Sequence, residues 1–343
     1  GRLLNECFGT EQDVLLLCPT QNENMQNAEF VSSSNSHIAI IDYDQQVWTY
    51  GRNNKGCLGH KIEPACRIPR KVPGLSHITM VACGYDYTMC LDSNFDVWAF
   101  GTNSLGQLGF ADCLPRITPT KVEAIQQSIT SISCGSQHTL FITSEGFVMV
   151  TGSNSVVQLG TDPLLSNTYF SVPMIIEELS DITGISCGFA FSMVLDEFGR
   201  IFSFGQEKFL GRDRGSSIVK DLEHLADQVI CASSRTFCID LEGELWGWGA
   251  NNNGELGIPA CPYVLEPTHI PGIGGGIIDV AAGSLHTIVK NDHGMIWVFG
   301  LNSHGALGLG NTIQHPQPSL LGAEYLAKLG YSLPQSKSAK NRR

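Results

Sequence analysis

Charged residues are scarce in this chain, and long apolar runs are absent. Only 16% of its 343 residues are charged, and Asp and Glu outnumber Lys and Arg by 33 to 21. The net charge of −12 disfavours direct binding to a nucleic-acid backbone. The terminal basic residues are more typical of a disordered tail than of a binding element: Lys337, Lys340, Arg342 and Arg343. No run approaches the roughly 18 apolar residues of a membrane-spanning helix, so we expect no membrane span.

Common catalytic and metal-binding patterns are missing as well. The chain contains no His-Glu-x-x-His, no phosphate-binding Gly-Lys-Ser/Thr and no Gly-x-Ser-x-Gly. Its twelve cysteines are scattered without a Cys-x-x-Cys pair, which favours reduced thiols over a disulfide scaffold or a metal site. We therefore predict a cytoplasmic or nuclear protein with no cofactor, no metal ion and no catalytic residue.

Glycine, by contrast, is abundant at 37 residues, which favours a turn-rich, strand-rich protein. A short apolar-aromatic segment that ends in glycine, or a close variant of it, recurs six times. These glycines are Gly51, Gly101, Gly152, Gly205, Gly249 and Gly300. They are separated by 50, 51, 53, 44 and 51 residues, which indicates a repeat architecture.

A second block of the type Cys/Ala-Gly-x-x-His/aromatic-Thr precedes each aromatic segment. Its small residue is Ser34, Gly84, Gly135, Gly188, Ala232 or Gly283, and the next segment glycine always follows 17 residues later. A constant interval predicts a strand, a short turn and a second strand in fixed register. Proline-containing stretches further along each repeat, such as 69–73, 115–119 and 267–271, predict an outer edge strand. Four short strands per repeat are typical of a propeller blade.

Most segment glycines are followed by a cluster of the type Asn-x-x-Gly-x-Leu-Gly, as in 53–59, 103–109, 252–257 and 302–308. Asn and Gly tolerate positive φ, so these clusters predict tight turns with a buried leucine. Together with the block and the aromatic segment, they resemble the regulator of chromosome condensation repeat, and the resemblance covers nearly all of residues 1–320.

The resemblance implies an all-β fold, a β-propeller with seven blades. The chain shows six complete four-stranded repeats, and Gly1 and Gly9 repeat the spacing of Gly51 and Gly59. We therefore expect a seven-bladed type whose last blade is incomplete in this chain, the missing hairpin having preceded Gly1. Residues 1–322 are assigned to the propeller and 323–343 to a short helical and basic tail.

Two functions are compatible with this resemblance. The first is a protein-interaction propeller within a larger regulatory protein, which docks a small GTPase or a ubiquitination-related protein. The second is a guanine-nucleotide exchange factor for a Ran-like GTPase, as in the founding member, although the repeats leave no room for that protein's inserted wedge. The plant ultraviolet-B photoreceptor branch of this family uses Trp-Arg pairs in the block. This chain has Tyr85-Asp86 and Ser136-Gln137 at those positions, which disfavours a photoreceptor.

The turns inside the blocks are expected to gather around the propeller axis on one face, where propellers place recognition loops. The predicted partner-binding residues are Tyr85, Asp86, Gln137, His138, Phe189, Arg235, Leu285 and His286. His138 and His286 also fit a packing role, because they recur at equivalent repeat positions. The short repeat 205–232 is a second candidate site, or else a decayed blade, and carries Glu207, Lys208, Arg212, Asp213 and Arg214.

Overall fold

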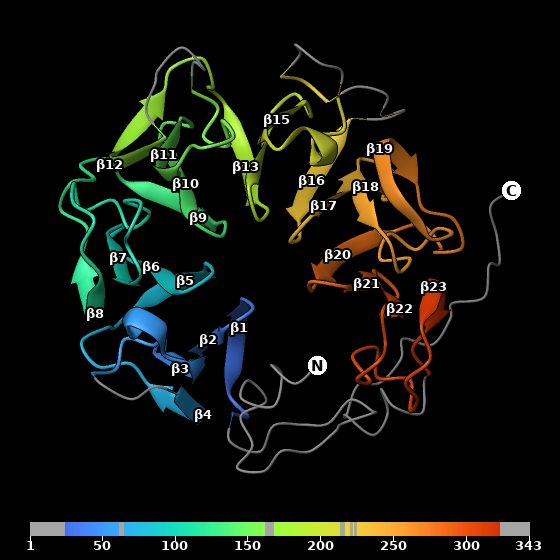
Figure 1. Ribbon diagram of the computed structural model, residues 1–343, viewed down its shortest axis with the longest axis horizontal. Helices are drawn as coiled ribbons and strands as arrows, with labels where there is room; N and C mark the ends of the chain where they lie inside the picture. The colour runs from blue at the N-terminus through green and yellow to red at the C-terminus, as the bar shows by residue number, and fades with distance from the viewer. Residues whose placement is uncertain are drawn as a thin grey trace, which may run out of the picture.

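The computed structural model describes residues 25–61, 65–161, 168–212, 217–219, 222 and 225–322. Within them, antiparallel sheets stand around a common axis like the blades of a propeller (Figure 1). Six blades are formed by the described residues. The seventh blade and the tail 323–343 predicted from the sequence fall outside them.

Each blade runs from an innermost strand at the axis to an outermost strand at the rim. Blade 1 consists of β1 (Ala28–Ser33), β2 (His37–Asp42), β3 (Val47–Arg52) and β4 (Ala65–Lys71). Blade 2 consists of β5 (Ile78–Cys83), β6 (Tyr87–Asp92), β7 (Val97–Gly101) and β8 (Arg116–Lys121). Blade 3 consists of β9 (Ile129–Cys134), β10 (His138–Thr143), β11 (Val148–Ser153) and β12 (Tyr169–Ile176). Blade 4 consists of β13 (Ile182–Cys187), β14 (Phe191–Asp196) and β15 (Ile201–Gly205). Blade 5 consists of β16 (Ala226–Cys231), β17 (Arg235–Asp240), β18 (Leu245–Asn251) and β19 (Cys261–His269). Blade 6 consists of β20 (Ile277–Ala282), β21 (His286–Asn291), β22 (Ile296–Gly300) and β23 (His315–Leu320).

The constant interval of the sequence reappears as one register in all six hairpins. The first residue of each second strand faces the segment glycine of the third strand, as in Tyr87 opposite Gly101 and His138 opposite Gly152. At Gly101, φ is +110°, and an added Cβ would lie 2.5 Å from the carbonyl oxygen of Asp86. Glycine is therefore required here by both backbone conformation and space.

The apolar core lies between neighbouring blades. One buried cluster joins Met89 and Ala99 of blade 2 to Phe141 and Met149 of blade 3, and each of the other four clusters likewise joins two successive blades. No blade covers both of its own faces, so each repeat depends on its neighbours for burial.

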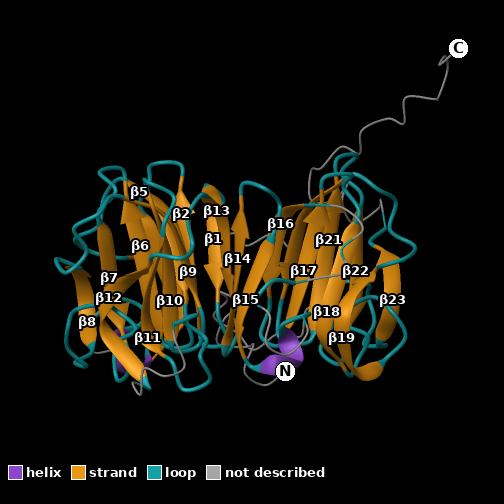
Figure 2. Ribbon diagram, turned by 90° about the horizontal axis from the view of Figure 1, so that it is seen from above, coloured by secondary structure: helices purple, strands orange, loops and turns teal. Residues whose placement is uncertain are grey.

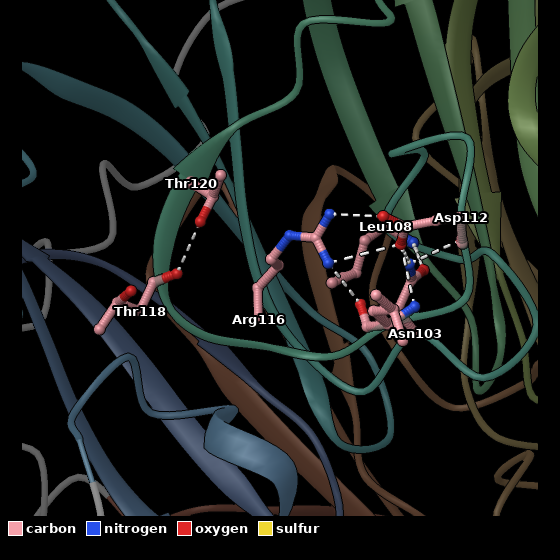
Figure 3. A network of polar contacts seen from close by, with 7 residues as sticks. Asn103, Leu108, Asp112, Arg116, Thr118 and Thr120 are labelled. Atoms are coloured by element: carbon pink, nitrogen blue, oxygen red, sulfur yellow. Dashed lines mark hydrogen bonds and ion pairs between the residues drawn. The ribbon is translucent and has the colours of Figure 1, made fainter.

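The turn after the third strand is held by its asparagine. In blade 2, Asn103 Oδ1 accepts a hydrogen bond from the Leu108 amide at 2.9 Å, and Asn103 Nδ2 donates to the carbonyl of Asp112 at 2.9 Å (Figure 3). The Asp112 carboxylate also pairs with Arg116 at 2.8 Å. The leucine is fully buried, as predicted. Blade 3 has the same turn at Asn154 although Val157, with φ of +62°, replaces the first glycine.

Blade 4 departs from the four-stranded pattern. Its described sheet has three strands, and an isolated bridge between Phe202 and Ile218 stands where the other blades have a fourth strand. The repeat 205–232 is the shortest of the chain, so less chain is left for the outer strand. It still keeps the buried leucine of the turn, Leu210, which follows the short 3-10 helix η2 (Glu207–Phe209).

Candidate functional site at the axial turns

Each blade contributes one short turn between its innermost and second strands, and we call these six the axial turns: residues 34–36, 84–86, 135–137, 188–190, 232–234 and 283–285. They share one face of the ring with the Asn-Gly turns, because Asn54 of the 3-10 helix η1 (Asn54–Gly56) lies 3.4 Å from Asp86 Oδ1. Both 3-10 helices lie at the lower edge of the ring in the side view (Figure 2). We call this side the axial face.

Hydrogen bonds connect the axial turns around the ring. Ser136 donates from its amide and its hydroxyl to the carbonyl of Phe189, and the Phe189 amide donates to Ser233 at 2.8 Å. Between the last and first described blades, the Ser284 hydroxyl donates to Asn35 Oδ1 at 2.7 Å, although 249 residues separate them. The axial face is therefore a rigid surface on which exposed side chains are held in fixed positions.

Five of the eight predicted residues present side chains on this face. Tyr85, Phe189 and Leu285 are 49%, 50% and 43% exposed, and they come from alternate turns, those of blades 2, 4 and 6. Gln137 is exposed and Asp86 is half-buried. Partial burial raises the pKa of the Asp86 carboxyl above its ordinary value. The axial turns thus combine apolar anchors with polar side chains.

His138 and Arg235 do not reach this surface, because they are 0% and 1% exposed. Nε2 of His138 lies 3.0 Å from Ser192 Oγ in the next blade, and burial lowers the pKa of His138 to about 4. Arg235 Nη1 donates to the Ser284 carbonyl at 2.9 Å. Burial lowers the Arg235 pKa to about 10. The two side chains link neighbouring blades. The sequence placed them at a partner surface, whereas the structure buries them.

His286 is half-buried at the start of β21. Burial and, to a lesser extent, the charge of Arg235 lower the pKa of His286 to about 4. Its ring is therefore neutral near pH 7. His286 adds no charge to the axial face.

Four cysteines end four successive innermost strands: Cys83, Cys134, Cys187 and Cys231. Each Sγ donates to a backbone carbonyl of the preceding blade, for example from Cys83 to Ser32 at 3.4 Å and from Cys231 to Ser186 at 3.3 Å. Burial raises the pKa of all four thiols. They hold neighbouring strands together where these crowd the axis.

The second predicted site, in the short repeat 205–232, is only partly described, and Asp213 and Arg214 fall outside the described residues. Arg212 donates from Nε to Ser203 Oγ at 3.0 Å, within its own blade. Lys208 lies 4.7 Å from the centroid of the Tyr263 ring in blade 5. Both cations are thus engaged with the propeller itself.

Sequence profiles agree with the geometry of the hairpins. One profile of the Regulator of chromosome condensation (RCC1) repeat matches residues 44–91, 96–142 and 242–289, and a second profile of this repeat matches residues 129–156 and 277–306. The chain belongs to the RCC1 repeat family. The resemblance drawn from the block, the aromatic segment and the Asn-Gly turn is confirmed.

Curated relatives cover most of this RCC1 chain. The E3 ubiquitin-protein ligase HERC2 of Homo sapiens is 27% identical over 314 residues, which are 86% of this chain and 6% of HERC2. The Ultraviolet-B receptor UVR8 of Arabidopsis thaliana is 24% identical over 289 residues, 79% of this chain and 65% of UVR8. The chain therefore spans only a small part of the large ligase.

Solved structures share the architecture. Yeast RCC1 (Prp20) bound to Kap60 superposes with a TM-score of 0.78 at 20% identity, over 89% of this chain and 78% of that chain. Prp20p from Saccharomyces cerevisiae, studied for its binding to Gsp1p and histones, gives 0.77 at 22% identity, over 89% and 80%. At these identities the likeness shows the fold. In the described part of this chain, no helix is long and apolar enough to cross a membrane.

Proposed function

We propose that this RCC1 propeller is a protein-docking domain that binds its partner on the axial face, with Tyr85, Phe189 and Leu285 as anchors. The observation that carries the proposal is the exposure of these three large apolar side chains, at 49%, 50% and 43%, on a hydrogen-bonded ring of turns. Aromatic residues on rigid supports are the usual centres of binding energy in protein interfaces. Fixed turns also limit the entropy that is lost on binding.

The proposed partner is a small GTPase or a ubiquitination-related protein, in the cytoplasm or the nucleus. The polar residues around the anchors include Gln137, Asp86 and Ser284, and the axial turns themselves contain no Lys or Arg, although Lys55 and Lys208 of the 3-10 helices lie on the same face. Such a surface fits a protein better than a nucleic-acid backbone, which needs a basic footprint. Similarity to HERC2 and to Prp20p supports these two partner classes.

Guanine-nucleotide exchange on a Ran-like GTPase is the second candidate function. It is favoured by the fold shared with Prp20p and by the carboxylate of Asp86 beside the anchors. An exchange site of this kind should carry clustered acidic and histidine side chains near the axis. Since His138 is buried and His286 is half-buried and neutral, the axial face matches a docking surface better.

The test compares three forms of the purified propeller in cross-linking capture and in binding to a panel of small GTPases, Ran included. They are the unchanged protein, the variant Tyr85→Ala, Phe189→Ala, Leu285→Ala, and a control with Tyr43→Ala and Phe95→Ala. Tyr43 and Phe95 are also exposed, at 70% and 50%, but lie on the opposite face. Loss of three anchors should weaken partner binding about a hundredfold or more, whereas the control should bind normally.

Release of fluorescent nucleotide from the same GTPases separates the two functions. Binding without faster release supports docking. Faster release that disappears with Asp86→Ala would show an exchange factor instead. A partner that binds the anchor variant as tightly as the unchanged protein would exclude the axial face as the docking site.

A further inference from the structure

The face opposite the axial turns is built from the tips of the hairpins that join the second and third strands, and we call it the hairpin face. Where two blades meet there, the same two backbone hydrogen bonds recur. At blades 4 and 5, the Ala226 amide donates to the carbonyl of Gly199 at 3.1 Å, and the Leu241 amide donates to Leu225 at 3.0 Å. At blades 1 and 2, the Ile78 amide donates to Gln45 at 3.1 Å in the same way. The junctions are therefore directly comparable, position by position.

Three positions of each junction project from this framework: the middle residue of the first tip, the last residue of the linker, and the first residue of the second tip. They are Asp44, His77 and Ser93 between blades 1 and 2, Asn94, Ser128 and Ser144 between blades 2 and 3, and Glu145, Asp181 and Glu197 between blades 3 and 4. Between blades 4 and 5 they are Phe198, Leu225 and Leu241, and between blades 5 and 6 they are Glu242, Gly276 and Asp292. At these three positions, four junctions carry polar side chains or glycine, although exposed Phe95 stands beside them at the junction of blades 2 and 3. The junction of blades 4 and 5 alone, among the five described, carries three large apolar side chains.

All three apolar side chains are more than half exposed. The exposed fractions are 55% for Phe198, 54% for Leu225 and 64% for Leu241. They are brought together by the backbone, because Leu225 is hydrogen-bonded to Leu241 and a Cβ added at Gly199 would lie 2.6 Å from Leu225 Cβ. A contiguous group of exposed apolar side chains marks an interaction site, whereas single ones, such as Tyr43 and Phe95 on the same face, are ordinary.

Among the described residues around this group, carboxylates outnumber cations. Glu145, Asp181 and Glu197 occupy the junction on one side, and Glu242 and Asp292 occupy the junction on the other. Exposed Asp227 follows Leu225 within blade 5. Among the described residues beside the group, Arg200 lies 5.2 Å from the centroid of the Phe198 ring, and its charge is already matched by Asp196 at 2.6 Å. The apolar group is thus set in an acidic surround.

We propose that the junction of blades 4 and 5 on the hairpin face is a second docking surface, which binds a basic amphipathic segment of a partner protein. Apolar side chains of the segment would cover Phe198, Leu225 and Leu241, while its Lys or Arg residues face the flanking carboxylates. Complementary charge brings such a segment to the correct surface, and apolar contact holds it there. This site goes beyond the axial face, lies on the other side of the ring, and does not depend on it.

The experiment selects displayed random peptides on the whole propeller. A parallel selection uses the variant Phe198→Ser, Leu225→Ser, Leu241→Ser, which makes this junction resemble the polar ones. A matched control, Asp44→Ser with His77→Ser, alters the junction of blades 1 and 2. Because all five positions are exposed, we expect thermal unfolding of each variant to match that of the unchanged protein. We expect peptides with net positive charge and several apolar residues to be enriched about tenfold on the unchanged protein and on the control, relative to the serine variant.

A charge-reversal variant tests the role of the flanking carboxylates. The variant Glu145→Lys with Glu197→Lys should weaken the selected peptides about tenfold and should make their binding less sensitive to salt. Equal enrichment on the serine variant would overturn the proposal. Enriched peptides without cationic residues would overturn the assignment of a basic partner, and peptides lost only with Tyr85→Ala and Phe189→Ala would place binding on the axial face.

Discussion

Nε2 of His138 in blade 3 lies 3.0 Å from Oγ of Ser192 in blade 4. The Ser192 hydroxyl donates its own proton to the carbonyl of Gln158 at 2.7 Å, so it accepts from His138, whose proton is therefore on Nε2. Nδ1 is left buried without a hydrogen-bond partner. Protonation would place a charge in a fully buried site, and burial therefore lowers the pKa of His138 to about 4.

Stability should consequently fall in mild acid. His37 is also fully buried and lies 2.7 Å from Thr88 Oγ1. Its Nδ1, unlike that of His138, lies 3.0 Å from Ser36 Oγ, and burial lowers its pKa to about 4 as well. The histidines of the unfolded chain titrate near pH 6.5, so between about pH 6.5 and 4 the unfolded state binds more protons than the folded state. We expect the free energy of unfolding to drop over this range by about 3 kcal/mol for each buried histidine.

The variant His138→Phe isolates this effect from the protonation of carboxylates. Blade 4 has Phe191 at the equivalent position, and Ser192 keeps its bond to Gln158. Urea titrations at pH 7 and pH 4.5 should show a smaller difference for this variant than for the unchanged chain. His304→Phe, at an exposed position, serves as the control. Equal pH dependence of His138→Phe and the unchanged protein would contradict the prediction.

The axial turn of blade 5 differs from those of blades 2, 3, 4 and 6 in two coupled positions. In blade 2 a Cβ added at Gly84 would lie 1.9 Å from Cε1 of Tyr87, so the ring needs the glycine beneath it. Blade 5 has Ala232 and Arg235 at these positions, and the extended guanidinium reaches three carbonyls of blade 6. Tyr87 reaches two such carbonyls of blade 3 with its hydroxyl.

Arg235→Tyr alone should therefore destabilise the propeller by about 2 kcal/mol or more, because the ring meets the Ala232 methyl group. Ala232→Gly alone should cost about 1 kcal/mol or less. Their combination should recover much of the loss, which gives a favourable coupling energy in a double-mutant cycle measured by urea unfolding. Additive effects of the two changes would show that the ring does not need the glycine.

The hairpins could be predicted because their spacing is conserved within the chain itself. A register set by a 17-residue interval leaves one arrangement that keeps the same face buried, and all six hairpins adopt it. The Asn-x-x-Gly-x-Leu-Gly pattern does not predict the turn at Asn154, because Val157 stands where the other turns have glycine. The shared Asn and Leu, which make the hydrogen bond of that turn, were the better signal.

The candidate site was predicted less completely. The sequence places His138 and Arg235 next to the axial turns, yet each begins a strand and its side chain turns inward toward the neighbouring blade. The block glycine is the available signal, since a missing Cβ leaves room for a ring above it. The apolar group around Leu225 could not be found from periodicity, because its residues come from two hairpins and a linker of variable length.

The thiols at the axis should be chemically inert in the folded protein. Burial raises the pKa of Cys83 and of Cys187 to about 12, so only about one thiol in ten thousand is ionised at about pH 8. Iodoacetamide followed by peptide mass spectrometry should leave both unmodified in the native protein. Partly exposed Cys113 and Cys261 should react, and all four should react in urea. Rapid native labelling of Cys83 would show that the innermost strands open readily.

Asn103 of the blade 2 turn should contribute more to the free energy of unfolding than the ion pair between Asp112 and Arg116 beside it. Asn103 is fully buried, and Asn103→Ala leaves the Leu108 amide and the Asp112 carbonyl without their partner, which should cost about 2 kcal/mol. Asp112→Asn should cost less than about 1 kcal/mol, since the partly exposed pair with Arg116 contributes little.

Blade 6 has an asparagine, Asn311, at the position equivalent to Asp112, which supports the smaller effect of Asp112→Asn. There Asn302 donates to the carbonyl of Asn311 at 2.9 Å, and Asn311 Oδ1 accepts from the Ile313 amide at 2.8 Å. Asp112 makes the equivalent bond to the Leu114 amide at 2.9 Å, and an asparagine can keep it. Urea unfolding of the two variants should therefore rank Asn103→Ala well below Asp112→Asn in stability. The reverse order would mean that the salt bridge, rather than the buried amide, holds this turn.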